Sequence, residues 1–332
     1  DGGPRADSVE IDYSLTGLFS GRAEAVRIEG LDAHGAIDAK GSLSIPALDP
    51  VLGGDSSGGP AIPVLPFDRI ELEDFALSLE TPEGPVVIAG DGNLRVTGPD
   101  TIDFAVEISD LHTEWDERVS LKGTVRGSED GTLGLDGQME GMIVGPRLSL
   151  SFSSMVTGFM AGADLSGKVV FSRLDATTEI FQVEGIAGEI AYENKGEEPQ
   201  NLSFIFDLPK ARLYDRVIGP GHVEARFNGT RIAPTGNLDS EAGRLSFDAE
   251  GAPDAPDEPL AFTLGGALDP AILAALAGIE NAPSGGISVT ANGSLAAPTD
   301  FMDSATPELA ALLEALRIEA RIRSNLTDIA LP

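Results

Sequence analysis

The side chains best suited to acid–base or metal chemistry are three histidines, His34, His112 and His222. No two of them stand four residues apart, so the helical zinc-binding spacing is absent. His112 is followed by Glu114 and Asp116, which would share its face on a strand and could hold a divalent cation. A solvated outer face explains the same residues, and we therefore predict no metal and no cofactor.

A serine-containing run, Gly54-Asp55-Ser56-Ser57-Gly58-Gly59-Pro60, has the composition of the nucleophile loop of trypsin-like proteases with one serine inserted. The insertion shifts the backbone donors of the oxyanion hole. Only His34 precedes the run, whereas those enzymes place a histidine and then an aspartate before a late serine. We interpret the run as a flexible linker and expect no catalytic residues and no enzymatic activity.

Charge and cysteine content exclude several classes of protein. The 332 residues include 22 Lys and Arg against 54 Asp and Glu, a formal net charge of −32, which repels nucleic acid and anionic headgroups. The absence of cysteine excludes a disulfide scaffold and a thiolate metal site. At 42% hydrophobic residues, the chain is nevertheless apolar enough to fold.

The sequence contains no apolar run of the roughly 18 residues that a membrane-spanning helix requires. It begins at Asp1 without a methionine or a signal-peptide pattern. We expect a piece of a longer protein whose anchor or export signal lies upstream.

Apolar and polar residues alternate through most of the chain, which predicts many short strands with one apolar face each. Gly- and Pro-rich punctuation favours an antiparallel meander, with tight turns expected at Asp91-Gly92-Asn93, Glu129-Asp130-Gly131, Asp136-Gly137, Asn228-Gly229 and Asn292-Gly293. The residues expected to form the apolar lining are Val9, Ile11, Leu15, Val26, Ile28, Ile102, Phe104, Val106, Ile108, Leu148, Leu150, Phe152, Phe171, Leu202, Phe204, Phe206, Phe247 and Phe262.

Two short helices are expected, each able to close an apolar opening or to plug a core edge. One begins at Asp269 and Pro270 and ends at Gly278; the other begins at Thr306 and Pro307. We expect one continuous segment over 1–332, with a subdivision into 1–52 and 67–332 around the Gly/Ser/Pro-rich stretch 53–66.

Strands that carry apolar residues on one face must shield that face from water. In a β-sandwich two sheets bury these faces against each other, which would suit an adhesion or scaffold protein without a ligand. A single long, twisted and curled sheet would instead form an apolar groove. Such a groove could belong to a stand-alone carrier of a hydrophobic ligand or to a longer lipid conduit.

Three segments follow one another in a distinctive order: residues 25–31 (AVRIEGL), 35–45 (GAIDAKGSLSI) and 65–79 (LPFDRIELEDFALSL), followed by Thr81-Pro82-Glu83-Gly84-Pro85. This order resembles the membrane-proximal part of the YdbH branch of the AsmA-like proteins of Gram-negative bacteria, relatives of TamB. The resemblance is clearest over residues 24–98. The remainder is similar in style, including the helix start at Leu268-Asp269-Pro270.

The resemblance implies a β-groove in the periplasm that carries phospholipid between the inner and outer membranes. It also implies an inner-membrane helix upstream of Asp1 and an outer-membrane lipoprotein as partner. No catalytic residue is carried over from the family. On this interpretation acyl chains lie against the apolar lining and headgroups remain in water.

Overall fold

The computed structural model describes residues 4–37, 43–44, 66–81, 84–110, 116–128, 130–145, 148–161, 164–178, 181–195, 201–213, 216–240, 243–252, 259–270, 285–295 and 316–325. Residue contacts divide the chain into an N-terminal unit, Asp1–Glu179, and a C-terminal unit, Ile180–Pro332. Residues 53–65, 271–284 and 296–315 lie outside the described residues. The subdivision at 53–66 and the two expected helices therefore remain predictions.

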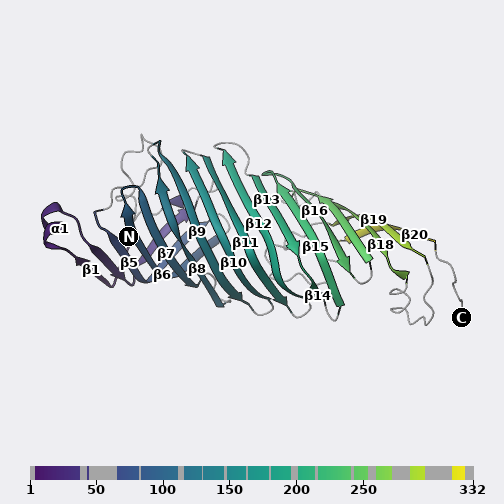
Figure 1. Cartoon of the computed structure of the whole chain (residues 1–332), viewed down its shortest axis with the longest axis horizontal. Coiled ribbons are helices and arrows are strands. Elements are labelled where there is room, and N and C mark those ends of the chain that lie inside the picture. Colours follow the sequence, from purple (N-terminus) through teal and green to yellow (C-terminus); the bar gives the residue numbers. More distant parts are fainter. Residues whose placement is uncertain are drawn as a thin grey trace. The chain divides into compact units, whose positions relative to one another are not determined.

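The N-terminal unit is a single sheet with one short helix (Figure 1). Its elements are β1 (Ser8–Asp12), α1 (Leu15–Ser20), β2 (Ala25–Glu29), β3 (Asp32–Ile37), β4 (Leu43–Ser44), β5 (Arg69–Thr81), β6 (Gly84–Gly98), β7 (Thr101–Asp110), β8 (Asp116–Gly127), β9 (Thr132–Val144), β10 (Leu148–Ala161) and β11 (Asp164–Thr178).

From β5 to β10 each strand pairs antiparallel with the next, which is the expected meander. The two strands β2 and β3 instead lie parallel to β5, one after the other along its edge. The chain between Ser44 and Arg69 is long enough for the crossover that parallel pairing requires. The antiparallel prediction thus holds for most of this unit, with a parallel exception at β5.

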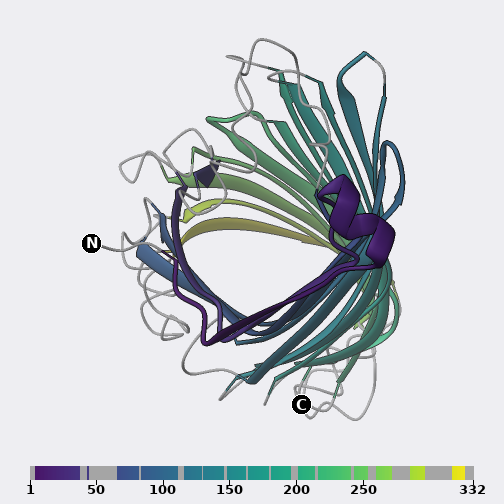
Figure 2. The same ribbon diagram turned by 90° about the vertical axis from the view of Figure 1, so that its left-hand side faces the viewer.

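The C-terminal unit is also a single sheet of antiparallel neighbours. Its strands are β12 (Phe181–Lys195), β13 (Asn201–Leu208), β14 (Ala211–Leu213), β15 (Arg216–Phe227), β16 (Ile232–Ser240), β17 (Gly243–Glu250), β18 (Leu260–Leu268), β19 (Ile287–Leu295) and β20 (Leu316–Ser324). Strands β13 and β14 both lie between β12 and β15. The prediction of a mainly β chain is confirmed, and Figure 2 shows that the strands are curved along their length.

β-Bulges keep the apolar residues of long strands on one side of the sheet. In β5 the apolar positions are Ile70 and Leu72 before the register shift and Phe75 and Leu77 after it. The extra residue moves the alternation from even to odd numbers, and without the bulge these side chains would point to opposite faces. The bulge residue Asp74 has φ 53°, and its amide donates to Asp91 Oδ1 at 3.0 Å.

Candidate functional site

The register of the N-terminal sheet places the expected apolar residues on one face. Directly paired residues point to the same side of a sheet, and Phe104 pairs with Leu94 and Gly123. The same reasoning, followed from strand to strand, defines the apolar face of this unit. It contains Val9, Ile11, Val26, Ile28, Ile70, Leu72, Phe75, Leu77, Leu79, Leu94, Val96, Ile102, Phe104, Val106, Ile108, Val119, Leu121, Val125, Leu133, Leu135, Met139, Ile143, Leu148, Leu150, Phe152, Val156, Met160, Leu165, Val169, Phe171 and Leu174.

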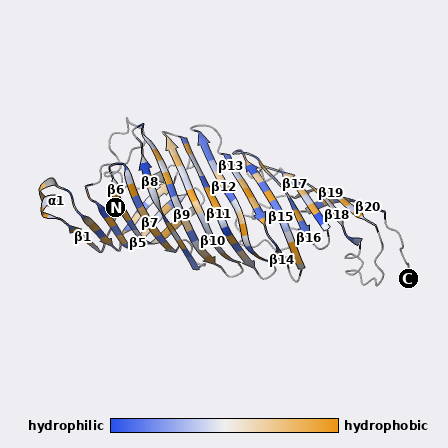
Figure 3. Ribbon diagram, viewed as in Figure 1, coloured by the Kyte–Doolittle hydropathy of each residue, from blue (hydrophilic) through white to orange (hydrophobic). Residues whose placement is uncertain are grey.

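The C-terminal sheet has an apolar face of the same kind. Phe204 pairs with Ile190 and Ala225, and Phe247 pairs with Leu264. This apolar face contains Ile190, Tyr192, Leu202, Phe204, Phe206, Leu208, Val223, Ala225, Phe227, Ile232, Leu238, Leu245, Phe247, Phe262, Leu264, Val289, Ala291, Ile318 and Ile322. Figure 3 shows the alternation of hydrophobic and hydrophilic residues along individual strands from which both faces arise.

One prediction of the apolar lining is wrong. Leu15 does not continue β1 but begins helix α1, because Ser14 caps the helix by accepting a hydrogen bond from the Gly17 amide at 3.0 Å. The alternation Val9, Ile11, Tyr13, Leu15 therefore ends with the strand at Asp12. Conversely, both faces include residues that the alternation had not singled out, among them Phe75, Leu121, Leu135, Met139, Ile143, Val223 and Phe227.

Neither apolar face is covered by a second layer of described residues. The buried hydrophobic side chains among these residues are six alanines with Leu79, Ile102, Val119 and Val183, and no phenylalanine is among them. The phenylalanines Phe104, Phe152, Phe204 and Phe247 remain half-buried. A sandwich core would bury such rings completely. Each unit therefore presents its apolar side chains on a single sheet.

On the apolar faces, phenylalanine rings lie over glycines of the neighbouring strand. A Cβ built at Gly141 would lie 2.6 Å from Cζ of Phe152, its direct partner, so the ring occupies the space that another side chain would take. The same arrangement joins Phe104 with Gly123, Phe206 with Gly188, Phe247 with Gly236, and Phe262 with Gly293. Rings that lie across a glycine rise less above the sheet, which keeps the apolar surface level.

These pairs correct part of the turn prediction. Of the first expected turn, Asp130 and Gly131 are described; they connect strands, as Asn228-Gly229 does, and Gly131 and Gly229 have positive φ. Asp91-Gly92-Asn93, Asp136-Gly137 and Asn292-Gly293 instead lie inside β6, β9 and β19. Gly293 lies beneath Phe262 and accommodates that ring, whereas a Cβ at Gly92 would meet Leu72 and Phe75 at ordinary contact distances of 3.7 and 3.8 Å; none of these glycines turns the chain.

The opposite face of each sheet is polar and acidic, and its cations form ion pairs between strands. In the N-terminal unit Arg27 Nε lies 2.7 Å from Glu71 Oε2, and Arg126 Nη1 lies 2.6 Å from Asp136 Oδ2. In the C-terminal unit Arg244 pairs with Asp239 through two hydrogen bonds, which lower the pKa of that carboxyl. Apolar residues on the polar face, such as Met155 and Phe159, are exposed. The polar faces therefore hold most of the charge of the strands.

Two buried polar side chains interrupt the apolar face of the N-terminal unit. Ser154 is almost completely buried, and its hydroxyl donates to the Met139 carbonyl at 3.2 Å. Glu117 pairs in register with Ile143 and is also buried. Apart from such exceptions, the strands offer few hydrogen-bonding side chains on this side.

On the polar face of the C-terminal unit, His222 lies between two carboxylates, an arrangement that the sequence did not predict. His222 Nδ1 lies 2.7 Å from Asp207 Oδ1, and Nε2 lies 3.2 Å from Glu224 Oε1. The hydrogen bonds to Asp207 and Glu224 raise the pKa of His222. Glu224 was visible in the sequence two residues away, whereas Asp207 comes opposite His222 only through the pairing of β13 with β15.

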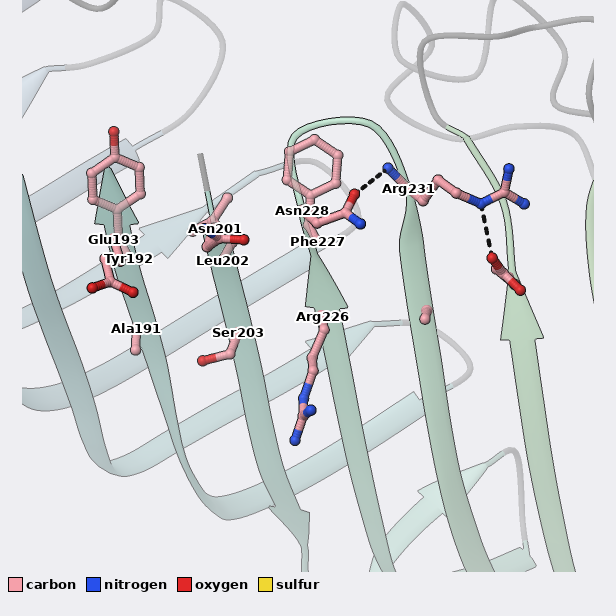
Figure 4. A pocket seen from close by; sticks show the side chains of 12 residues that line it. Ala191, Tyr192, Glu193, Asn201, Leu202, Ser203, Arg226, Phe227, Asn228 and Arg231 are labelled. Carbon is pink, nitrogen blue, oxygen red and sulfur yellow. Dashed lines mark hydrogen bonds and ion pairs between the residues drawn. The ribbon is translucent and has the colours of Figure 1, made fainter. Parts of the chain in front are cut away.

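A depression of about 440 Å³ lies at the ends of β12, β13 and β15–β17 in the C-terminal unit (Figure 4). Its lining includes Arg226 and Arg231, and the Arg231 Nε lies 2.8 Å from Glu250 Oε1. Ser203 and Arg226 pair in register and point to the polar face. Tyr192, Leu202 and Phe227 of the apolar face line it as well, so the depression lies at strand ends where residues of both faces meet.

Within the part of the chain that the structure describes, no group of three or more acidic or histidine side chains is placed to hold a metal ion. His112 and Glu114 lie outside this part, so the expectation of no metal at His112, Glu114 and Asp116 remains a prediction. None of the described helices is long and apolar enough to cross a membrane.

No protein-family model, no curated protein and no solved structure matches this chain.

Proposed function

We propose that this chain is a non-enzymatic lipid-transfer segment that carries phospholipid acyl chains along a hydrophobic β-groove between the inner and outer membranes of a Gram-negative cell envelope. The observation that carries the proposal is the uncovered apolar face of each unit. Seventeen of the residues expected to line a groove, from Val9 to Phe262, fall on these faces once the register is followed.

Hydrocarbon is the ligand chemistry that fits such a face. The side chains offer few donors or acceptors, so a polar ligand would lose its hydrogen bonds to water without replacement. Each methylene of an acyl chain gains about 0.8 kcal/mol when it leaves water. This attraction has no preferred direction, and a level surface of this kind can hold a chain while allowing it to slide.

The arrangement of charge favours a phospholipid over a wholly apolar ligand. Carboxylates occupy the opposite face, where they keep the sheet soluble while one side remains apolar. A phospholipid can place its acyl chains against the apolar face and leave its headgroup in water. The resemblance of residues 24–98 to the AsmA-like proteins supports the same ligand and a periplasmic location.

The single-layer sheets favour this function over a β-sandwich scaffold. A sandwich requires two sheets whose apolar sides meet, whereas the strands of each unit follow one another within one sheet. A stand-alone carrier would use the same face, and it differs from a conduit in needing no anchor at either membrane.

The first test is mass spectrometry of the chain purified from bacterial membranes. We expect phospholipid to co-purify and to be lost when detergent competes for the apolar faces. A lipid-free protein under gentle extraction would contradict the proposal.

A second test locates the lipid by photocrosslinking in cells. A photoreactive residue at Phe104 or Phe204 should label phospholipid, because both side chains lie on apolar faces. The matched controls are Glu107 on β7 and Ile205 on β13, which point to the polar side of the same strands. Equal labelling at all four positions would show that lipid does not distinguish the two faces.

A further inference from the structure

Helix α1 presents the two most exposed large apolar side chains among the described residues, Phe19 and Leu15, together with the exposed Leu18. Leu15, Leu18 and Phe19 are 80%, 61% and 91% exposed. These positions are spaced i, i+3 and i+4, so they share one side of the helix. A solvent-facing cluster of two leucines and a phenylalanine on a soluble protein indicates a binding surface.

The helix is held in place in a way that keeps these side chains outward. Ser14 caps its first turn, and Gly21 ends it in the left-handed conformation with φ 70°. The Arg22 amide then donates to the Gly17 carbonyl at 2.9 Å. The connection from β1 to β2 is therefore ordered at both helix ends, and Figure 1 shows α1 lying past the end of β1.

The tip formed by Tyr13–Gly21 carries no charged residue, in a chain with 54 acidic residues. Asp12 precedes it and Arg22 follows it, with Arg22 held 2.6 Å from Asp68. A protein partner of such an acidic chain would be expected to bind it through complementary positive charge. An uncharged Leu/Phe tip instead matches the side chains that enter the boundary between headgroups and acyl chains of a bilayer.

The tip also follows directly in the chain on β1, a strand of the apolar face. Val9 and Ile11 of β1 lie on that face at the edge of the sheet, and both are exposed. Hydrocarbon contacted by Leu15, Leu18 and Phe19 would therefore lie next to the start of the apolar lining. A bilayer supplies such hydrocarbon without requiring a specific protein surface.

We propose that the α1 tip inserts into the surface of a lipid bilayer and docks the N-terminal unit there. On zwitterionic membranes the contact is hydrophobic and therefore insensitive to salt. Anionic membranes bind more weakly, because Asp12 and Glu24 near the tip repel their charge, and salt should reduce this difference. Docking adds a membrane contact to the proposed lipid-carrying function. Its test is independent of that function, because a chain that carries no lipid can still bind a vesicle.

The experiment is flotation of the full chain with phosphatidylcholine vesicles. The double variant Leu18→Glu with Phe19→Glu should reduce the bound fraction about tenfold or more, since it replaces the inserting hydrocarbon by charge. The matched control is Met155→Glu with Phe159→Glu, which adds the same charge at two exposed apolar residues on the polar face. The control should float as the unchanged chain does.

Fluorescence reports insertion directly. A Phe19→Trp reporter in a Trp115→Phe background should shift its emission to shorter wavelength when vesicles are added. Absence of flotation, or equal loss in both double variants, would overturn the proposal. Concentration-dependent self-association that Leu18→Glu with Phe19→Glu abolishes, without vesicle binding, would overturn it in favour of a contact between copies.

Discussion

The two faces of the sheets use the same residue types in different ways. On the apolar face of the N-terminal unit, the Phe152 ring lies over Gly141 of β9. On the polar face, Phe159 pairs in register with Gly134 of the same strand, yet a Cβ at Gly134 would meet only the Arg126 carbonyl, at 4.0 Å. Phe159 is exposed, whereas Phe152 also contacts Phe171, with ring centroids 6.3 Å apart.

This difference shows that the surroundings, and not the residue pair, decide where a ring lies. Between apolar neighbours a ring removes the most apolar surface from water by lying across a glycine. Among polar neighbours it has little apolar surface to cover. The apolar face is therefore packed laterally within one layer, and the polar face is held by ion pairs such as Arg126–Asp136.

The largest expected effect separates the two faces by ligand binding. Phe204→Asp should reduce co-purifying phospholipid about tenfold or more, because a carboxylate against hydrocarbon costs several kcal/mol. Ile205→Asp places the same group on the adjacent residue, which points to the polar side. It should leave the lipid content unchanged, as measured by mass spectrometry. A similar loss in both variants would remove the distinction between the faces.

Glycine substitutions test the lateral packing. Gly141→Ala should lower the free energy of unfolding by about 2 kcal/mol, because its Cβ overlaps the Phe152 ring. Gly134→Ala, in the same strand, should be neutral or slightly stabilising. Denaturant unfolding measures both. Adding Phe152→Leu should restore part of the stability of Gly141→Ala; failure to do so would indicate backbone strain and not the ring as the cause.

Valine truncations compare burial on the two faces without changing charge. Val119 on the apolar face is 9% exposed, and Val170 on the polar face is 39% exposed. Val119→Ala should cost about 1.5 kcal/mol through lost burial and a small cavity. Val170→Ala should stay within about 0.5 kcal/mol of the unchanged chain. Equal costs would mean that the apolar face gains nothing from its lateral packing.

The smallest effect concerns pH at His222 on the polar face. Asp207 and Glu224 raise its pKa in the folded chain, and the facing residue on β16 is the neutral Asn237. The stabilisation is fully present below the unfolded pKa of about 6.5 and is lost as pH rises through the raised folded value. The melting temperature should therefore fall slightly between about pH 6 and about pH 8. His222→Gln should flatten this dependence; an unchanged slope would assign it to other groups.

The alternation of residues was sufficient to predict the strands and most of the lining. Every expected lining residue except Leu15 lies on an apolar face, because period two fixes which side chains share a side. Glycine was harder to interpret. A Gly beside Asn or Asp predicts a turn equally well at Asn228-Gly229, where one exists, and at Asn292-Gly293, where Gly293 lies under Phe262.

Local alternation dictates that this chain forms many strands with one apolar and one acidic side, because it acts within each strand. Long-range pairing fixes what local patterns cannot encode. Register brought Phe152 over Gly141 and Asp207 beside His222, and bulges restored the apolar side after an extra residue. Ser14 and Gly21 turned the expected end of the first strand into a helix, which left Leu15, Leu18 and Phe19 outside the sheet.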